Sequence, residues 1–208
     1  MSTACRRSQV GGRAGALVIL AALLAGCAPK PPDNRGYVAT LSSEREGKDA
    51  QFMEEDDPVP RNRKAELLPL AYFPIDPDYN VPAALRPAAE EVVVDMPTST
   101  GKPLRHRIVG SVEFVLKGEQ HRLVATVEVG APNLNHITVM FNDLTSGTET
   151  YAAGRYVDVF LNPQGIYELD FNRAYNPYCY YNESYQCPYP PPENRLKVPI
   201  RAGERTKV

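Results

Sequence analysis

Apolar residues recur at every second position over most of the chain from Glu91 to Phe171, and this alternation constrains the fold most strongly. A period of two places alternate side chains on opposite faces of a β-strand. Turn signals at 98–102 and 117–120 separate the alternating runs. The buried faces are expected to hold Val112, Phe114 and Leu116; Leu123, Ala125, Val127 and Val129; Ile137, Val139 and Phe141; Val157, Val159 and Leu161; and Tyr167, Leu169 and Phe171. The pattern predicts a mainly β fold, an antiparallel meander that forms a small barrel or sandwich.

Three further segments accompany the predicted strands. Ser43 and Glu46 have the spacing of a capping box, so a short N-terminal helix is expected to run from Ser43 to about Glu55. The segment 67–85 is apolar but interrupted by prolines, which favours an extended cover over a central strand. Residues 196–204 are expected to add a last edge strand.

The N-terminus has the features of a bacterial lipoprotein leader. Three arginines precede an apolar run, Ala14 to Gly26, which is too short to span a bilayer comfortably. The run ends in Leu24-Ala25-Gly26-Cys27, which resembles a lipobox in which the Cys27 thiol takes a diacylglycerol. An ordinary signal peptide that happens to contain a cysteine is the alternative.

These features predict a domain organisation and a location. We expect a signal peptide over residues 1–26, lipidation at Cys27, a tether over 27–42 and a single β-rich domain over 43–208. Because residue 28 is not aspartate, the lipobox resemblance implies sorting to the outer membrane, with the domain facing the periplasm. Two or three acyl chains give stable anchoring.

The balance of acidic and basic residues indicates which classes of partner the chain can bind. Beyond residue 26 the chain holds 20 basic and 25 acidic residues. Proteins that bind nucleic acid need a positive surface to displace counterions. The sequence therefore predicts no nucleic-acid partner, and it predicts a membrane reached through the lipid anchor.

Two cysteines lie within the predicted domain, Cys179 and Cys187. An even pair in an oxidising compartment favours a disulfide, which would close a loop of about nine residues and stabilise the fold by about 2–3 kcal/mol. The chain lacks the cysteine or histidine spacing that a zinc site needs. A catalytic thiol lacks a histidine nearby in sequence, although contact in space remains open.

This pair lies in a stretch, residues 169–196, that is typical of neither helix nor strand. Six of the twelve tyrosines of the chain fall between 175 and 189, among several prolines. One interpretation is a long, stapled loop whose tyrosines cover one end of the barrel. The other is a recognition surface, because rigid amphipathic rings suit sugars or peptides, and peptidoglycan is the polymer near such an anchor.

Three segments carry a resemblance: DLTSGTETYAAGRY at 143–156, YELDFNRAYNPYC at 167–179 and CPYPPPENRLKVPIRAGE at 187–204. In this order they resemble the motifs of an uncharacterised bacterial domain-of-unknown-function family, D-x-T-x-G-x-x-T-Y-x-x-G-R-Y, L-D-F-N-x-A-Y-N-P-x-C and C-P-x-P-P-x-E-N-x-L. The resemblance extends over about residues 44–205. It implies a fold and a grouping but no reaction, since the family has no established activity.

The polar residues of these motifs form our candidate binding site. Arg155 offers a planar fork for a carboxylate or a phosphate. Its partner is expected to be Asp170 or Glu193, in a buried salt bridge, or else a bound ligand. The residues around Gly147 are typical of a tight turn, in which short side chains bond the local backbone. The full candidate set is Asp143, Thr150, Tyr151, Arg155, Asp170, Asn172, Asn176 and Glu193.

No motif of the chain names a reaction. His106, His121 and His136 suggest a three-histidine metal site, but lone histidines on strands are usually ordinary polar residues. The chain lacks the nucleophile elbow, zinc-protease, phosphate-loop and dinucleotide motifs, and no metal or cofactor is expected. We predict a lipid-anchored envelope protein with a binding or structural role, toward a cell-wall polymer or a small anionic ligand. The alternative is a small periplasm-facing hydrolase, or another enzyme, that uses the carboxylates and the arginine of the candidate site.

Overall fold

The computed structural model describes residues 33–131, 136–160 and 167–207, and strands dominate this part of the chain. The main sheet consists of β2 (Asn80–Met96), β3 (Leu104–Leu116), β4 (Glu119–Glu128), β5 (His136–Phe141), β6 (Arg155–Phe160) and β7 (Tyr167–Asp170). A two-stranded sheet pairs β1 (Ala71–Tyr72) with β8 (Glu204–Arg205). The helical elements are α1 (Arg35–Glu54), η1 (Arg61–Arg63), α2 (Lys64–Leu67), η2 (Pro77–Tyr79), η3 (Phe171–Arg173), α3 (Tyr178–Tyr181) and η4 (Pro192–Asn194).

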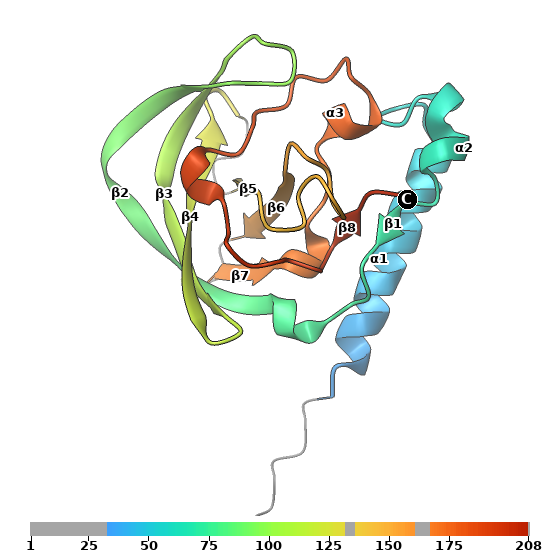
Figure 1. Ribbon diagram of the computed structural model, residues 1–208, viewed down its shortest axis with the longest axis horizontal. Coiled ribbons are helices and arrows are strands. Elements are labelled where there is room, and N and C mark those ends of the chain that lie inside the picture. Colours follow the sequence, from blue (N-terminus) through green and yellow to red (C-terminus); the bar gives the residue numbers. More distant parts are fainter. Residues whose placement is uncertain (1–32, 132–135, 161–166, 208) are drawn as a thin grey trace, which may run out of the picture. The chain divides into compact units, whose positions relative to one another are not determined.

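The six main strands curve into a nearly closed barrel (Figure 1). Their order is β6-β5-β4-β3-β2-β7, and all pairings are antiparallel. Strands that follow one another from β2 to β6 are neighbours, while β7 returns to pair with β2, where Leu169 lies opposite Val81. The predicted mainly β fold, an antiparallel meander, is confirmed.

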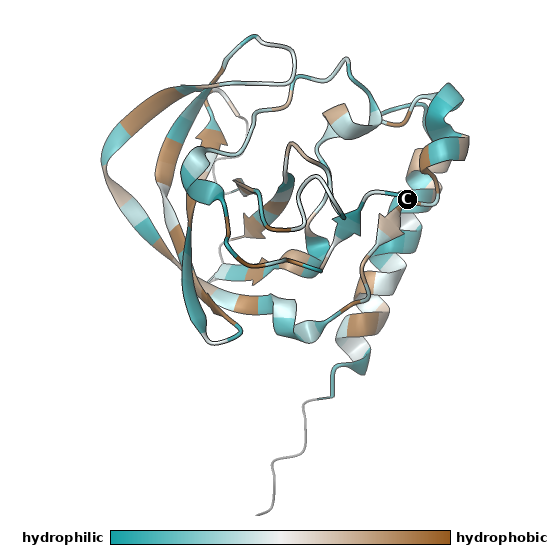
Figure 2. Ribbon diagram, in the orientation of Figure 1, coloured by the Kyte–Doolittle hydropathy of each residue, from teal (hydrophilic) through white to brown (hydrophobic). Residues whose placement is uncertain are grey.

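Alternation along the strands fills the inside of this barrel. Figure 2 shows apolar and polar segments following one another along the strands. The predicted inward residues of β3 to β7 lie in one buried core, which also takes in Leu196, Ile200 and Ala202 from the C-terminal segment. Val129 is the exception: β4 ends one residue earlier, and its side chain is exposed. Leu161, also predicted to face inward, lies outside the described residues.

An irregularity in the pairing of β2 with β3 explains how β2 accommodates prolines. Pro82 lies before the ladder with β3 begins, and Pro87 pairs with Gly110 just before the register shifts. Proline has no N–H to donate, so both positions avoid the middle of a ladder bonded on both sides. The prediction that segment 67–85 would contain no central strand is therefore wrong, because residues 80–85 begin β2, which lies between β3 and β7 in the sheet.

Helix α1 runs beside the barrel, past β1 and β8 (Figure 1). It begins at Arg35, eight residues before the predicted start, so the capping role predicted for Ser43 is wrong. Leu41 and Phe52 are its buried residues, and the former lies in the range predicted as tether. In the part of the chain that the structure describes, no helix is both long enough and apolar enough to cross a membrane.

Beyond η4, the C-terminal segment joins the barrel without forming a long strand. Of the predicted edge strand over 196–204, β8 retains only the last residue. Leu196 and Ile200 are buried in the core, but their backbone lies outside any named strand. Buried carbonyl oxygens outside strands need other donors.

Candidate functional site

Arg155, the first residue of β6, supplies donors to this C-terminal segment. Its guanidinium donates to the backbone carbonyls of Ile200 (2.7 Å), Ala202 (2.5 Å) and Glu204 (3.0 Å). It also donates to Oδ2 of Asp143 at 2.9 Å, and both side chains of this ion pair are 1% exposed. Burial lowers the pKa of Arg155, and the Asp143 carboxylate opposes that shift. These bonds are all internal, which supports a structural role for Arg155.

The predicted partners of Arg155, Asp170 and Glu193, are both wrong. Phe141 of β5 lies opposite Arg155 in the sheet, so Asp143, two residues further along, comes within reach of the guanidinium. Glu193 is exposed on η4, and Asp170 bonds other groups at the end of β7.

The carboxylate of Asp143 also organises the turn that follows β5. Its Oδ1 accepts hydrogen bonds from the backbone N–H and the hydroxyl of Thr145, both at 2.6 Å. The hydroxyl of Thr150 lies 3.0 Å from that of Thr145. Gly147 has a φ of 83°, a conformation that glycine adopts without strain. Tyr151, half-buried after this turn, packs its ring 5.2 Å from that of Tyr180.

Asp170 and Asn172 bind α1. The hydroxyl of Tyr37 donates to Oδ1 of Asp170 at 2.8 Å, and Nδ2 of Asn172 donates to the same hydroxyl at 3.0 Å. The Asn172 side chain also holds the backbone of Asp76, through bonds of 3.0 and 2.8 Å. These two residues therefore attach the N-terminal helix to the barrel.

Glu204 is a buried acid that the sequence-based prediction missed, although it belongs to the AGE of the last resembling segment. It is 1% exposed. Its Oε1 accepts from Nζ of Lys48 at 2.6 Å. Its Oε2 accepts from the backbone N–H of Asn176 at 2.9 Å and from the hydroxyl of Tyr181.

The eight predicted residues do not form one site. Asn172 borders a cavity beside α1, and Glu193 borders a different cavity beneath the prolines 190–192. Asp143, Thr150 and Arg155 are buried in contact with one another or with the turn. The geometry thus supports a role for the set in holding the fold.

A different cavity gathers more of the chemistry that recognises ligands. It lies on the outer face of β5 and β6, where residues 175–188 cover the sheet, and we call it the tyrosine groove. Its volume is about 480 Å³. It is lined by Lys48, His136, Tyr156, Asp158, Tyr175, Pro177, Tyr178, Tyr185, Gln186, Cys187 and Pro188. An adjoining cavity of about 310 Å³ shares five of these residues and continues over the sheet to His106, Thr126 and Glu128.

The strands place these side chains by the same alternation that builds the core. Ile137 and Val157 face the interior, so their neighbours His136, Tyr156 and Asp158 face outward. The period-two alternation therefore predicts that these side chains face outward. It gives no reason to choose them as a binding site, because no motif links them.

Asp158 is the centre of a polar cluster in the groove. Its Oδ1 accepts from the hydroxyl of Thr138 at 2.9 Å and from that of Tyr175 at 3.2 Å. Nε2 of His136 lies 3.0 Å from the same oxygen. Burial, followed by the charge of Asp158, raises the pKa of Tyr175, so this hydroxyl keeps its proton and remains a donor.

The tyrosine rings of the groove are fixed in pairs. Tyr178 and Tyr185 meet edge to face with centroids 5.1 Å apart, and Tyr156 and Tyr175 do so at 5.9 Å. The hydroxyl of Tyr156 donates to the carbonyl of Pro188, and that of Tyr185 donates to Asp57. This last bond raises the pKa of Tyr185 to about 12. Tyr178 is 44% exposed, so an aromatic face is available at the mouth.

The charges of the groove do not favour an anion. Lys48 is already paired with Glu204, and the carboxylates of Asp158 and Glu128 lie in the groove and in its extension. Burial lowers the pKa of His106, with the charge of Glu128 opposing, so this imidazole tends toward its neutral form. A neutral, hydroxyl-bearing ligand suits these groups better than a phosphate or a carboxylate.

The histidines do not assemble as the metal hypothesis required. His106 and His136 both border the extension of the groove, whereas His121 stacks on Phe114 at 5.4 Å and borders a different hollow. Among the described residues, no three histidine, cysteine, aspartate or glutamate side chains are grouped suitably for a metal ion.

Cys179 and Cys187 lie together at the edge of the groove as free, buried thiols, so the predicted disulfide is not present in this structure. The backbone N–H of Cys179 lies 3.1 Å from Sγ of Cys187. The hydrogen bond between the two thiols lowers the pKa of Cys179 to about 7 and raises that of Cys187.

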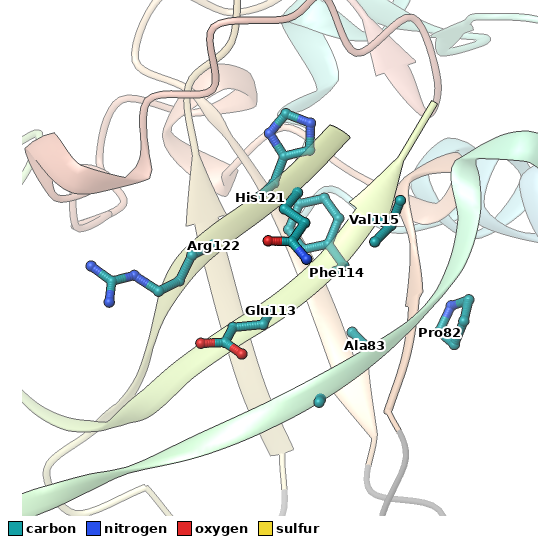
Figure 3. A pocket seen from close by; sticks show the side chains of 9 residues that line it. Pro82, Ala83, Glu113, Phe114, Val115, His121 and Arg122 are labelled. Carbon is teal, nitrogen blue, oxygen red and sulfur yellow. The ribbon is translucent and has the colours of Figure 1, made fainter. Parts of the chain in front are cut away.

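A larger hollow lies elsewhere, over β2, β3 and β4, with a volume of about 630 Å³ (Figure 3). Figure 3 shows its side chains spread along the three strands, with Glu113 and Arg122 at one side and Pro82 and Val115 at the other. Glu113 is already paired with Arg86 at 2.9 Å, and both are well exposed. The dispersed lining makes it a weaker candidate than the tyrosine groove.

A comparison with protein-family models identifies the family of this chain. Residues 66–205 match the family model described as "Protein of unknown function (DUF1684)". The chain belongs to this family. The match begins beyond α1, so this helix lies outside the matched range. Its contacts with Asp170 and Glu204 are made to residues within that range.

A solved structure has a similar fold. It is the solution NMR structure of an uncharacterized protein of Haloarcula marismortui, 34% identical, which covers 84% of this chain and 96% of that chain with a TM-score of 0.65. Among curated proteins, none matches the chain. The comparisons therefore establish the family and the fold, and they name no activity.

We predict that Arg155→Met lowers the free energy of unfolding by about 3–5 kcal/mol, since it leaves Asp143 buried without its cation and removes the donors to three carbonyls. Arg201→Met is the matched control: the Arg201–Glu149 pair is mostly exposed, and its loss should cost less than about 1 kcal/mol. Urea unfolding measures both. An Arg155→Met protein as stable as the control would contradict the structural role.

Proposed function

We propose that this DUF1684 protein is attached by a lipid at Cys27 to the bacterial envelope, at the outer membrane and facing the periplasm, and that it binds cell-wall glycan in the tyrosine groove. The observation that carries the proposal is the groove itself, in which paired tyrosine rings surround the Asp158 cluster. The leader and Leu24-Ala25-Gly26-Cys27 support the anchor.

A glycan fits the groove on three counts. Tyrosine rings offer flat apolar faces for the C–H faces of a sugar and hydroxyls for its polar edge. The carboxylate of Asp158, the amide of Gln186 and the imidazole of His136 add acceptors and donors in the same cavity. Among the described residues that line the groove, Lys48 is the one lysine or arginine, and it is already paired with Glu204, so no strong attraction for an anionic ligand remains.

The hydrolase alternative finds less support in the geometry. It required Asp143, Arg155, Asp170 and Glu193 to converge, but the ion pair of the first two is buried and Glu193 is exposed on another element. Paired carboxylates act in acid–base catalysis when they face one substrate. Here Asp143 and Asp170 are buried, whereas Glu193 borders the cavity beneath the prolines 190–192.

We predict that Cys27→Ser abolishes lipid attachment, because the serine hydroxyl cannot replace the thiol in thioether formation. Cells grown with a labelled fatty acid should yield labelled wild-type protein and an unlabelled variant that remains uncleaved or leaves the membrane fraction. Wild-type protein without label would refute the anchor.

We predict that the mature protein sediments with purified peptidoglycan sacculi, and that Tyr178→Ala and Tyr185→Ala each weaken this binding about tenfold, equivalent to ~1.4 kcal/mol. Tyr189→Ala is the matched control, since Tyr189 is exposed in the same loop but borders the other cavity. Equal losses in all three variants, or no sedimentation of the wild type, would exclude glycan binding in the groove.

We also propose that Cys179 and Cys187 form a disulfide in the oxidising envelope, because the backbone N–H of Cys179 lies 3.1 Å from Sγ of Cys187 and the Cys179 thiol has a lowered pKa. The bond would stabilise the oxidised protein by about 2–3 kcal/mol relative to the reduced protein. Urea unfolding with and without reductant measures the difference, and Cys179→Ala/Cys187→Ala should lose the response to reductant. Two titratable thiols in unfolded, unreduced protein taken from the envelope would count against the bond.

A further inference from the structure

The ammonium of Lys48 lies in an aromatic and acidic enclosure where α1 meets the barrel. Its Nζ is 2.6 Å from Oε1 of Glu204. It lies 5.3 Å from the ring centroid of Tyr175, 6.0 Å from that of Tyr181, and 5.2 Å from that of Phe52 on its own helix. A carboxylate combined with aromatic faces is the arrangement by which proteins select ammonium groups.

The acceptor side of this enclosure is built without α1. Glu204 is fixed by the backbone N–H of Asn176 at 2.9 Å and by the hydroxyl of Tyr181, which is fully buried. These residues and Tyr175 lie within the range that matches DUF1684, whereas Lys48 lies before it. The barrel thus positions a buried carboxylate and two rings, and a cation reaches them from a segment outside the matched range.

A cavity beside Lys48 accompanies the carboxylate. Its volume is about 220 Å³, and Tyr72, Tyr175 and Glu204 also line it. A buried carboxylate is stable only when it is paired, so this position requires a cation.

We propose that the barrel carries a binding site for a primary ammonium group, formed by Glu204, Tyr175 and Tyr181, and that Lys48 occupies this site as an internal ligand. The ligand class is a small, unbranched primary amine, since the lysine side chain that fills the site is one. Lys48 and Tyr175 also line the tyrosine groove, so the two sites are adjacent. The proposal goes beyond glycan binding and holds whatever the groove binds.

Chemical rescue tests the site. Lys48→Ala removes the ammonium and the three methylenes next to it, which propylammonium replaces atom for atom. We expect the melting temperature of Lys48→Ala to fall, and propylammonium chloride at ten times its dissociation constant to raise it again by about 3–6 °C. The neutral isostere 1-propanol, and sodium chloride at equal ionic strength, should not.

Two further variants make the result specific. Lys64→Ala is the matched control, because Lys64 pairs with the partly exposed Asp56, and propylammonium should leave its melting temperature unchanged. Lys48→Ala/Glu204→Gln lacks the carboxylate and should not respond either. If Lys48→Ala does not fold alone, its refolding yield with and without propylammonium is measured, and recovery with the amine supports the site. A folded Lys48→Ala that ignores the amine, an equal response of Lys64→Ala, or refolding equally poor with and without amine would overturn it.

Discussion

The fold depends on the way in which Arg155 binds the C-terminal segment. Residues 196–203 contribute apolar side chains to the barrel core but form no named strand, so their carbonyls need donors from elsewhere. The Arg155 guanidinium donates hydrogen bonds to the carbonyls of Ile200, Ala202 and Glu204. It also donates to the carboxylate of Asp143. Arginine alone among the side chains presents this many donors in a rigid fork. The tight turn after β5 holds the carboxylate of Asp143 in place through the hydrogen bonds from Thr145.

Helix α1 is attached to the barrel largely through polar contacts. The Tyr37 hydroxyl donates to Asp170, Arg45 donates to the carbonyls of Phe73 and Asn172, and the Lys48 ammonium donates to Glu204. Such charged hydrogen bonds fix the position of the helix by their geometry more than by the apolar area that they bury. Asp170 and Glu204, which lie within the DUF1684 range, thus stabilise the junction between the barrel and the helix that leads to the predicted tether.

The sequence predicted the barrel well, because period-two alternation reports directly on which side chains face a core. It failed at α1, where only Leu41 and Phe52 are buried and no apolar stripe marks the start of the helix. It failed at β2 because prolines disfavour a central strand, whereas Pro87 lies beside a register shift. It missed Asp143 as the partner of Arg155, since that choice follows from the pairing of β5 with β6. The tyrosine groove draws on α1, β5, β6 and the loop, and no local pattern links such distant segments.

We propose that recognition occurs in the tyrosine groove, while the buried ion pair of Arg155 and Asp143 holds the fold. This proposal is tested by an NMR titration of the mature protein, with its tyrosine rings labelled with ¹³C, against a neutral disaccharide of N-acetylglucosamine, the uncharged sugar of the peptidoglycan strand. We expect the ring signals of Tyr156, Tyr175, Tyr178 and Tyr185 to shift, and those of Tyr79 and Tyr167 in the barrel core to stay in place. Shifts confined to the core tyrosines, or no tyrosine shift at a saturating concentration, would contradict the account.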